Sequence, residues 1–292
     1  MVNLAASAKH LKEQYWPLIK SRQTFLLTLT GVAGYFCERP MPISWPHFVG
    51  LIGSMLFTIG GCTVLNMVFD RDIDYKMSRT NRRPLATQQA DVRAASILGG
   101  ALLILGLAWS WSLSMLYFIL ALSGAVLDVL VYTLWLKRRM SWSIIWGGLS
   151  GGIPILAGSS LVTGRVEVSG LLLALAIVCW IPSHNLSLAM LYPDDYINAG
   201  IPTFLTEYGQ AATIGALALS SLLTAVLMSA AFGWLNLPLL TWAVSAVSGL
   251  GLIGLALYTW KYSGQQGVRL LYKYSSFYML AAMLLLMTNL LR

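Results

Sequence analysis

The sequence predicts an all-α membrane protein with about nine transmembrane helices, forming one domain over residues 1–292. Of these residues, 57% are hydrophobic and only 10% are charged, whereas a soluble domain carries about 25% charged residues. The mean hydropathy is +0.70. Apolar runs of roughly 20 residues, the length that crosses a bilayer as a helix, recur along the chain. The predicted spans are residues 22–37, 47–69, 93–112, 114–136, 142–162, 168–191, 211–232, 238–260 and 271–291.

The first predicted span is short and follows Lys20 and Arg22. It lacks the small-residue cleavage site of a signal peptide, so we interpret it as a retained helix. With nine spans and a cytoplasmic N-terminus, 16 of the 19 basic residues fall on the inner side, in agreement with the positive-inside rule. Only Arg39, Arg165 and Arg292 fall outside. We therefore expect a multi-pass protein of the cell membrane, whose net charge of +8 reflects its orientation rather than nucleic-acid binding.

Acidic residues concentrate in two predicted inner loops, residues 70–92 and 192–210. These loops follow the second and sixth spans and hold seven of the 11 Asp and Glu residues. Orientation in the membrane does not require acidic residues to cluster on a face rich in cations, so the clustering indicates a functional site. The seven residues are Asp70, Asp72, Asp74, Asp91, Asp194, Asp195 and Glu207.

The first acidic motif consists of Asn66, Asp70 and Asp74 at the inner end of the second span. Residues four apart share one face of a helix, so these oxygen-bearing side chains are expected to face the same space. Two carboxylates and an amide suit Mg²⁺, which binds one or two carboxylates together with water and substrate phosphates. The alternative is a solvated helix end whose acids pair with the neighbouring cations at positions 71, 76 and 79, a kind of pairing that contributes little.

Arginines follow directly at positions 79, 82 and 83, before Pro84. A guanidinium is a planar fork that binds phosphate in two places, and the proline ends any continuing helix. The positive-inside rule explains the presence of these charges but not their position next to the acidic motif. Carboxylates for a metal ion beside arginines for an anion are the combination that a Mg²⁺-bound diphosphate needs.

A second acidic pair, Asp194 and Asp195, follows the sixth span. It is placed to bind a second Mg²⁺ or the other side of the same diphosphate. His184 and Asn185 lie two to three turns deeper in that span, where ionisable residues usually have a function. For His184 the two interpretations are a role at the substrate and a hydrogen bond between helices. Asp128, in the fourth span, is either a cavity residue or the partner of a neighbouring helix.

These residues together suggest ionisation of an allylic diphosphate at the membrane surface. Mg²⁺ and arginines would neutralise the leaving diphosphate, while apolar and aromatic walls would shelter the carbocation. A transporter would also have many helices, but it would concentrate its polar residues near the midplane. A heme-binding membrane protein would need axial ligands, for which His184 is the one histidine in the predicted hydrophobic core.

The two acidic motifs and the arginines resemble the UbiA superfamily of intramembrane prenyltransferases. Residues 66–74 and 79–85 are similar to the patterns NxxxDxxxD and RTxxRPL of its protoheme IX farnesyltransferase (heme O synthase) branch. The resemblance covers roughly residues 18–210. Further segments match in the same order: Lys20 with Arg22, and residues 132–139, 147–148, 194–196 and 199–202.

The resemblance implies a helical bundle around a central cavity that opens to lipid, capped on the cytoplasmic side by the two acidic loops. It implies transfer of a farnesyl group from farnesyl diphosphate to heme b, giving heme O, with Mg²⁺ as cofactor. The expected metal ligands are Asn66, Asp70, Asp74, Asp194 and Asp195, which together with His184 are the expected catalytic residues. The expected substrate-binding residues are Arg22, Arg79, Arg83, Lys137, Tyr132, Asn185 and Tyr192.

One segment departs from the branch. The branch usually reads PHFWALA where this chain has Ser183, His184, Asn185 and then Leu-Ser-Leu-Ala. The histidine is kept and the two aromatic residues after it are not. Because these positions are expected to face the acceptor, the alternative acceptors are a quinone-precursor ring and a lipid glycerol phosphate, prenylated by the same chemistry.

Overall fold

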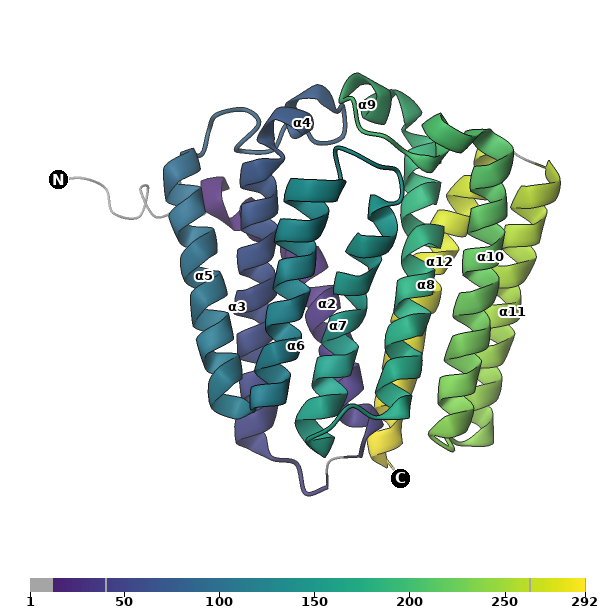
Figure 1. Ribbon diagram of the computed structural model, residues 1–292. Coiled ribbons are helices and arrows are strands. Elements are labelled where there is room, and N and C mark those ends of the chain that lie inside the picture. The colour runs from purple at the N-terminus through teal and green to yellow at the C-terminus, as the bar shows by residue number, and fades with distance from the viewer. Residues whose placement is uncertain (1–12, 40, 263, 292) are drawn as a thin grey trace.

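The protein is a bundle of long helices, seen here in a computed structural model that describes residues 13–39, 41–262 and 264–291. Within these residues the secondary structure consists of helices and contains no strand. The long helices lie side by side, and the short helices α4 and α9 lie together across one end of the bundle (Figure 1). The prediction of an all-α architecture is therefore confirmed.

The long helices coincide with the predicted apolar runs. They are α2 (Ser21–Cys37), α3 (Trp45–Phe69), α5 (Val92–Leu113), α6 (Met115–Ala125), which continues into the π-helix η2 (Val126–Leu136), α7 (Ser143–Thr163), α8 (Val168–Leu191), α10 (Phe204–Trp234), α11 (Leu239–Tyr262) and α12 (Gln265–Met287). The short helices are η1 (Trp16–Ile19), α4 (Arg71–Lys76), α9 (Pro193–Asn198) and η3 (Thr288–Leu291).

Eight helices in the described part of the chain are long and apolar enough to cross a membrane, so the chain is a multi-pass membrane protein. The helix α2, which matches the first predicted span, has 17 residues, fewer than the roughly 20 of a typical crossing. A count of nine crossings therefore stays a prediction. Two other predicted spans begin later than the helices that contain them. The helix α12 starts at Gln265, and α10 starts at Phe204 but has non-helical backbone at Gly209, just before the predicted start.

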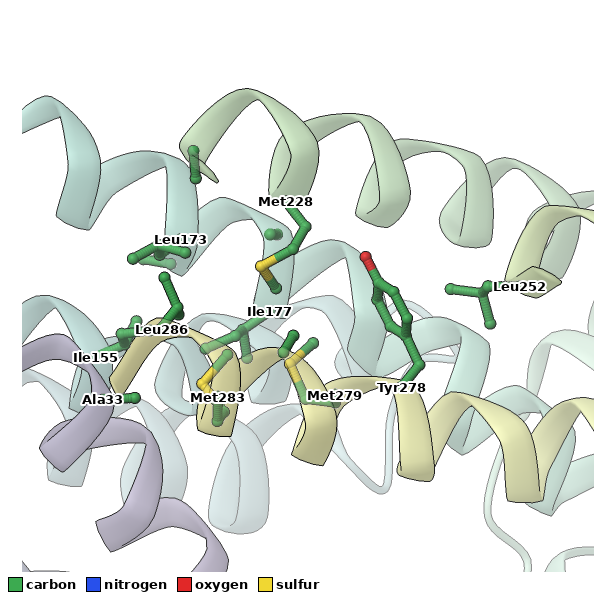
Figure 2. Packing of buried hydrophobic residues seen from close by; sticks show 14 of the residues in the cluster. Ala33, Ile155, Leu173, Ile177, Met228, Leu252, Tyr278, Met279, Met283 and Leu286 are labelled. Atoms are coloured by element: carbon green, nitrogen blue, oxygen red, sulfur yellow. The ribbon is translucent and has the colours of Figure 1, made fainter. Parts of the chain in front are cut away.

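The helix α2 is held in the bundle by its close approach to α7. A side chain added at Gly158 of α7 would overlap the carbonyl oxygen of Gly31 in α2, and one added at Gly34 would overlap the carbonyl of Ile155. Small residues allow helix backbones to come this close. The largest buried cluster continues from this contact through α8, α10 and α12, with Ile155, Ile177 and Met228 among its members (Figure 2).

The two acidic loops dock on each other through apolar residues. Ile73 and Met77, in and after α4, form a small buried cluster with Ala199 and Ile201, which follow α9. We use the name cap for residues 70–91 and 192–203, which include α4 and α9 at the same end of the bundle (Figure 1). That the cap lies on the cytoplasmic side stays a prediction.

Replacement of Gly158 by alanine is expected to destabilise the protein by about 1–3 kcal/mol, the usual cost of overpacking. The added Cβ meets backbone atoms of α2, which cannot move without moving the helix. The measurement is the thermal midpoint in detergent. Gly100→Ala in α5 is the matched control, because its Cβ would meet nothing within 4 Å. Equal midpoints for the two variants would contradict this account of how α2 is held.

Candidate active site

The first acidic motif lies where α3 ends and α4 begins. Asp70 closes α3 and opens α4, and the backbone amide of Asp74 donates to the carbonyl of Asp70 at 2.8 Å. This turn keeps both carboxylates at the same junction. Asp70 and Asp74 are 5% and 4% exposed, whereas Asp72 is exposed. Buried carboxylates are tolerated only when paired, so their partners define the site.

Each buried carboxylate is paired with a cation from another part of the chain. Lys137 Nζ, directly after η2, donates to Asp70 Oδ2 at 2.5 Å. Arg83 Nη1, in the cap, donates to both oxygens of Asp74 at 2.8 and 2.7 Å. The structure thus brings together two acidic and two basic residues that the sequence had placed in one candidate site.

The side-chain amide of Asn66 is hydrogen-bonded to the π-helix η2 through both its nitrogen and its oxygen. Its Nδ2 donates to Asp128 Oδ2 at 2.8 Å, and its Oδ1 accepts from Thr133 Oγ1 at 3.0 Å. The same threonine hydroxyl lies 2.9 Å from the carbonyl of Asp128, five residues earlier, which is the spacing of a π-helix. Asp128 is therefore the partner of a neighbouring helix, and the amide of Asn66 is oriented before any ligand arrives.

Lys20 is a site residue that the candidate set did not include. It precedes α2 in a left-handed conformation, with φ of 45°. Burial, together with the nearby positive charges of Arg83 and Lys137, lowers its pKa to about 8, although the carboxylates of Asp70 and Asp128 oppose this shift. The available sequence signal was a lysine immediately before an apolar span; it was assigned to membrane orientation and to the family resemblance, but not to the site.

Asp195 joins the two halves of the cap. It is 7% exposed, and its two carboxylate oxygens accept from the backbone amides of Ser78 at 2.8 Å and Arg79 at 3.2 Å. Burial acts to raise the pKa of this carboxyl, but the hydrogen bonds from Ser78 and Arg79 hold it below its usual value. Both oxygens of Asp195 are thus directed at the loop that carries Arg79, while Asp194 is exposed.

The other predicted residues lie around this centre at different depths. Arg22, Arg79 and Tyr192 are exposed at the cap end. Lys137 Nζ lies 5.9 Å from the centroid of the Tyr132 ring. In α8, Asn185 is half-buried, and the neighbouring His184 lies between Trp180 of the same helix and Tyr272 of α12.

Two clefts lie outside the paired acids. One, of about 450 Å³, is bordered by Asp72 and Arg138, whose exposed ion pair lowers the pKa of Asp72 through hydrogen bonds from the guanidinium. The other, of about 330 Å³, lies at the opposite end of α3, beside His47 and Arg39. The predicted central cavity that opens to lipid stays a prediction.

The residues of the site fit a hard divalent cation. Among the described residues no group of three or more His, Cys, Asp and Glu side chains is placed to hold a metal. However, Asp70 Oδ1 is buried and has no hydrogen-bond partner in the described part of the chain. A buried carboxylate oxygen without a partner is costly, and a cation that shares its other ligands with a substrate would satisfy it.

The chain is thus a multi-pass helical membrane protein with paired, buried carboxylates and cations at one end of its bundle. The chain belongs to the UbiA prenyltransferase family, which matches it over residues 27–288.

Two curated relatives are both called protoheme IX farnesyltransferase. The protein of Thermofilum pendens is 38% identical over 215 residues, which make up 73% of this chain and 74% of that protein. The protein of Thermus thermophilus is 39% identical over 220 residues, which make up 73% of this chain but only 35% of that longer protein.

Solved structures of the family share the fold. A digeranylgeranylglyceryl phosphate synthase superposes with a TM-score of 0.82 at 18% identity, over 97% of this chain and 100% of that one. A UbiA homologue from Archaeoglobus fulgidus bound to DMAPP and Mg²⁺ gives 0.69 at 18% identity, over 94% and 99% of the two chains. At these identities the likeness establishes the fold.

Asp195→Ala is expected to loosen the cap. Hydrogen bonds to a charged group contribute about 1.5–3 kcal/mol, so amide hydrogen exchange at Ser78 and Arg79 should be roughly tenfold faster or more. Because the pKa of Asp195 is lowered in the folded state, its contribution is complete at neutral pH and is lost as the pH falls through that lowered pKa. Asp194→Ala is the control, since that side chain is exposed, and equal exchange in both variants would contradict the assignment.

Proposed function

We propose that this chain transfers a farnesyl group from farnesyl diphosphate to a vinyl group of heme b, with Mg²⁺ as cofactor. Diphosphate leaves, and water adds to the cation formed on the porphyrin side chain, which gives heme O. The observation that carries the proposal is the pairing of Asp70 and Asp74 with Lys137 and Arg83, together with an Asp70 oxygen that has no hydrogen-bond partner among the described residues. The choice of farnesyl and heme b is supported by the names of the curated relatives.

The cations of the site would bind the diphosphate. Arg83 and Lys137 pair with the buried carboxylates, and Lys20, from a third segment, is near enough for the charges of Arg83, Lys137 and Asp70 to shift its pKa. In a partly buried site their charges are weakly screened, so they stabilise an anion more strongly than they would in water. As the carbon–oxygen bond of the allylic diphosphate breaks, negative charge grows on the departing oxygen, and cations fixed in advance stabilise it without reorganisation.

The carboxylates would hold the metal ion. Asp70 and Asp74 are the proposed ligands, and Asn66 is oriented beside them through Asp128 and Thr133. Mg²⁺, when bound, supplies further neutralisation of the leaving diphosphate. With the carboxylates engaged by the metal ion, Arg83 and Lys137, which now pair with Asp74 and Asp70, would be available to the phosphate oxygens. Asp195 acts differently in this proposal, because it positions the Ser78–Arg79 segment over the site.

The acceptor would lie deeper, against α8 and α12. His184 and Asn185 are placed seven and six residues before the end of α8 at Leu191, which corresponds to roughly 10 Å below the cap at 1.5 Å per residue. Diphosphate at the cap and acceptor within the bundle keep the carbocation away from water. With the cap on the cytoplasmic side, both substrates reach the site from the inner leaflet.

A turnover assay tests the proposal directly. Purified protein in detergent is incubated with Mg²⁺, farnesyl diphosphate and heme b, and the products are identified by mass. We expect a farnesylated, hydrated heme that forms with Mg²⁺ and disappears with EDTA. Diphosphate release without a heme product would overturn the acceptor and favour a quinone precursor or a lipid. Failure to bind diphosphate would overturn prenyl transfer itself.

Asp70→Ala and Asp74→Ala are expected to lower kcat/KM by at least about 100-fold, the loss typical for a group that stabilises transition-state charge. Asp72→Ala is the matched control, since this neighbouring carboxylate is exposed and pairs with Arg138 outside the centre. Asp70→Asn and Asp74→Asn, with thermal midpoints recorded, separate loss of chemistry from loss of folding. If a folded Asp70 or Asp74 variant retains turnover, the assignment of these residues to a metal site is wrong.

A further inference from the structure

His184 is enclosed between two aromatic rings. The indole of Trp180, one turn earlier in α8, lies 4.9 Å from the imidazole with an interplanar angle of 26°. The phenol ring of Tyr272 in α12 covers the other face at 4.6 Å and 26°. Trp180 is itself anchored to α12, because its Nε1 donates to the carbonyl of Ser275 at 2.8 Å. Both faces of the imidazole are therefore covered, and only its edge can meet a ligand.

The hydrogen bonds around this stack favour one tautomer of His184. Ser276 Oγ lies 3.2 Å from Nδ1 of the imidazole. The same hydroxyl lies 3.0 Å from the carbonyl of Tyr272, to which it can donate its single hydrogen. When that hydrogen is donated to the carbonyl, the oxygen of Ser276 accepts from Nδ1–H. A neutral imidazole protonated on Nδ1 has a free lone pair on Nε2, which is the form that binds a metal.

The backbone before His184 is opened by a side chain of α10. Ser220 Oγ accepts from the amide of Ser183 at 2.9 Å and donates to the carbonyl of Cys179, the group that this amide would reach in a regular helix. Pro182 lies inside the same turn and has no amide hydrogen. A hydroxyl inserted into the backbone hydrogen bonds next to a proline bends a helix. The regular hydrogen bonding of α8 is therefore interrupted at the residue that precedes the histidine.

We propose that His184 Nε2 is the axial ligand of the iron in the porphyrin acceptor, which it holds against α8 and α12 below the cap. The proposal rests on the proposed function, since the iron belongs to the acceptor. Imidazole is a common axial ligand of heme iron, and the Ser276 hydrogen bond is the outer contact that fixes the orientation of such a ligand. No hydrogen bond or ion pair within the described residues uses Nε2. A role restricted to joining α8 and α12 would use Nδ1 alone and would not require the free edge.

The test compares porphyrins that differ only in their metal. Purified protein in detergent is titrated with ferric heme b, zinc protoporphyrin IX and metal-free protoporphyrin IX, and binding is followed by absorbance and fluorescence. The intact protein is expected to bind the metallated forms at least tenfold more tightly than the metal-free form. His184→Ala should abolish this preference while leaving the affinity for the metal-free ring within about twofold.

Two further variants distinguish a ligand from a structural residue. His184→Gly should regain the preference for metallated porphyrin when free imidazole is added, whereas a purely structural role would not respond to imidazole. Ser276→Ala should weaken binding of the metallated forms by roughly 10-fold or more, as expected for the loss of an outer contact to a ligand. His47→Ala is the control, because His47 lies near the start of α3, at the end of that helix away from the acidic motif.

The outcomes separate this proposal from the proposed function. If the His184→Ala protein keeps the preference for metallated porphyrin and heme turnover continues, the assignment of His184 as axial ligand is wrong, while the proposed farnesyltransferase activity is retained. If the intact protein binds no porphyrin but hydrolyses or transfers from farnesyl diphosphate, both the acceptor and the ligand are overturned. Loss of the preference for metallated porphyrin in His184→Ala, with its recovery by imidazole in His184→Gly, supports the assignment of His184 as the axial ligand.

Discussion

The burial of two carboxylates at one end of the bundle governs the arrangement of the site. Asp70 and Asp74 are almost inaccessible, and an uncompensated buried charge costs about 3–5 kcal/mol. Their partners must come from elsewhere, so Lys137 is drawn in from the end of η2 and Arg83 from the cap. Within residues 13–39, 41–262 and 264–291, one oxygen of Asp70 still has no hydrogen-bond partner. The site is therefore assembled but incompletely satisfied, which is the condition in which a metal-bound anion can bind favourably.

The sequence predicted the features that depend on local patterns. Apolar runs reveal membrane helices because the bilayer requires them, and a four-residue spacing of polar groups placed Asn66, Asp70 and Asp74 in one region. The conversion of the fourth span into a π-helix at Val126 was not predicted. In this helix the hydroxyl of Thr133 contacts the carbonyl of Asp128 five residues earlier and Asn66 of the neighbouring α3, and the second contact requires the tertiary fold. Lys20 was also missed, since its charge alone could not distinguish a site residue from an orientation signal.

The second acidic pair shows that residue type alone does not predict the role of a carboxylate. Asp194 and Asp195 are adjacent and chemically identical, yet one is exposed and the other accepts two backbone hydrogen bonds. A carboxylate in a loop can bind a metal ion or accept hydrogen bonds from backbone amides, and the residue type does not distinguish the two roles. Asp195 holds the Ser78–Arg79 segment through these hydrogen bonds, and its role as a metal ligand stays a prediction.

The helix α8 links the two halves of the chemistry. Its C-terminal end leads directly into α9 and Asp195, while His184 lies about two turns deeper. In the proposed function, the distance between the leaving diphosphate and the acceptor would be set by one packed helix rather than by flexible loops. Because Ser220 is inserted into the backbone of α8 between Cys179 and Ser183, a change in α10 would move the proposed acceptor position without touching the charged centre. Under this proposal, acceptor selection would vary within such a bundle while the diphosphate site stays constant.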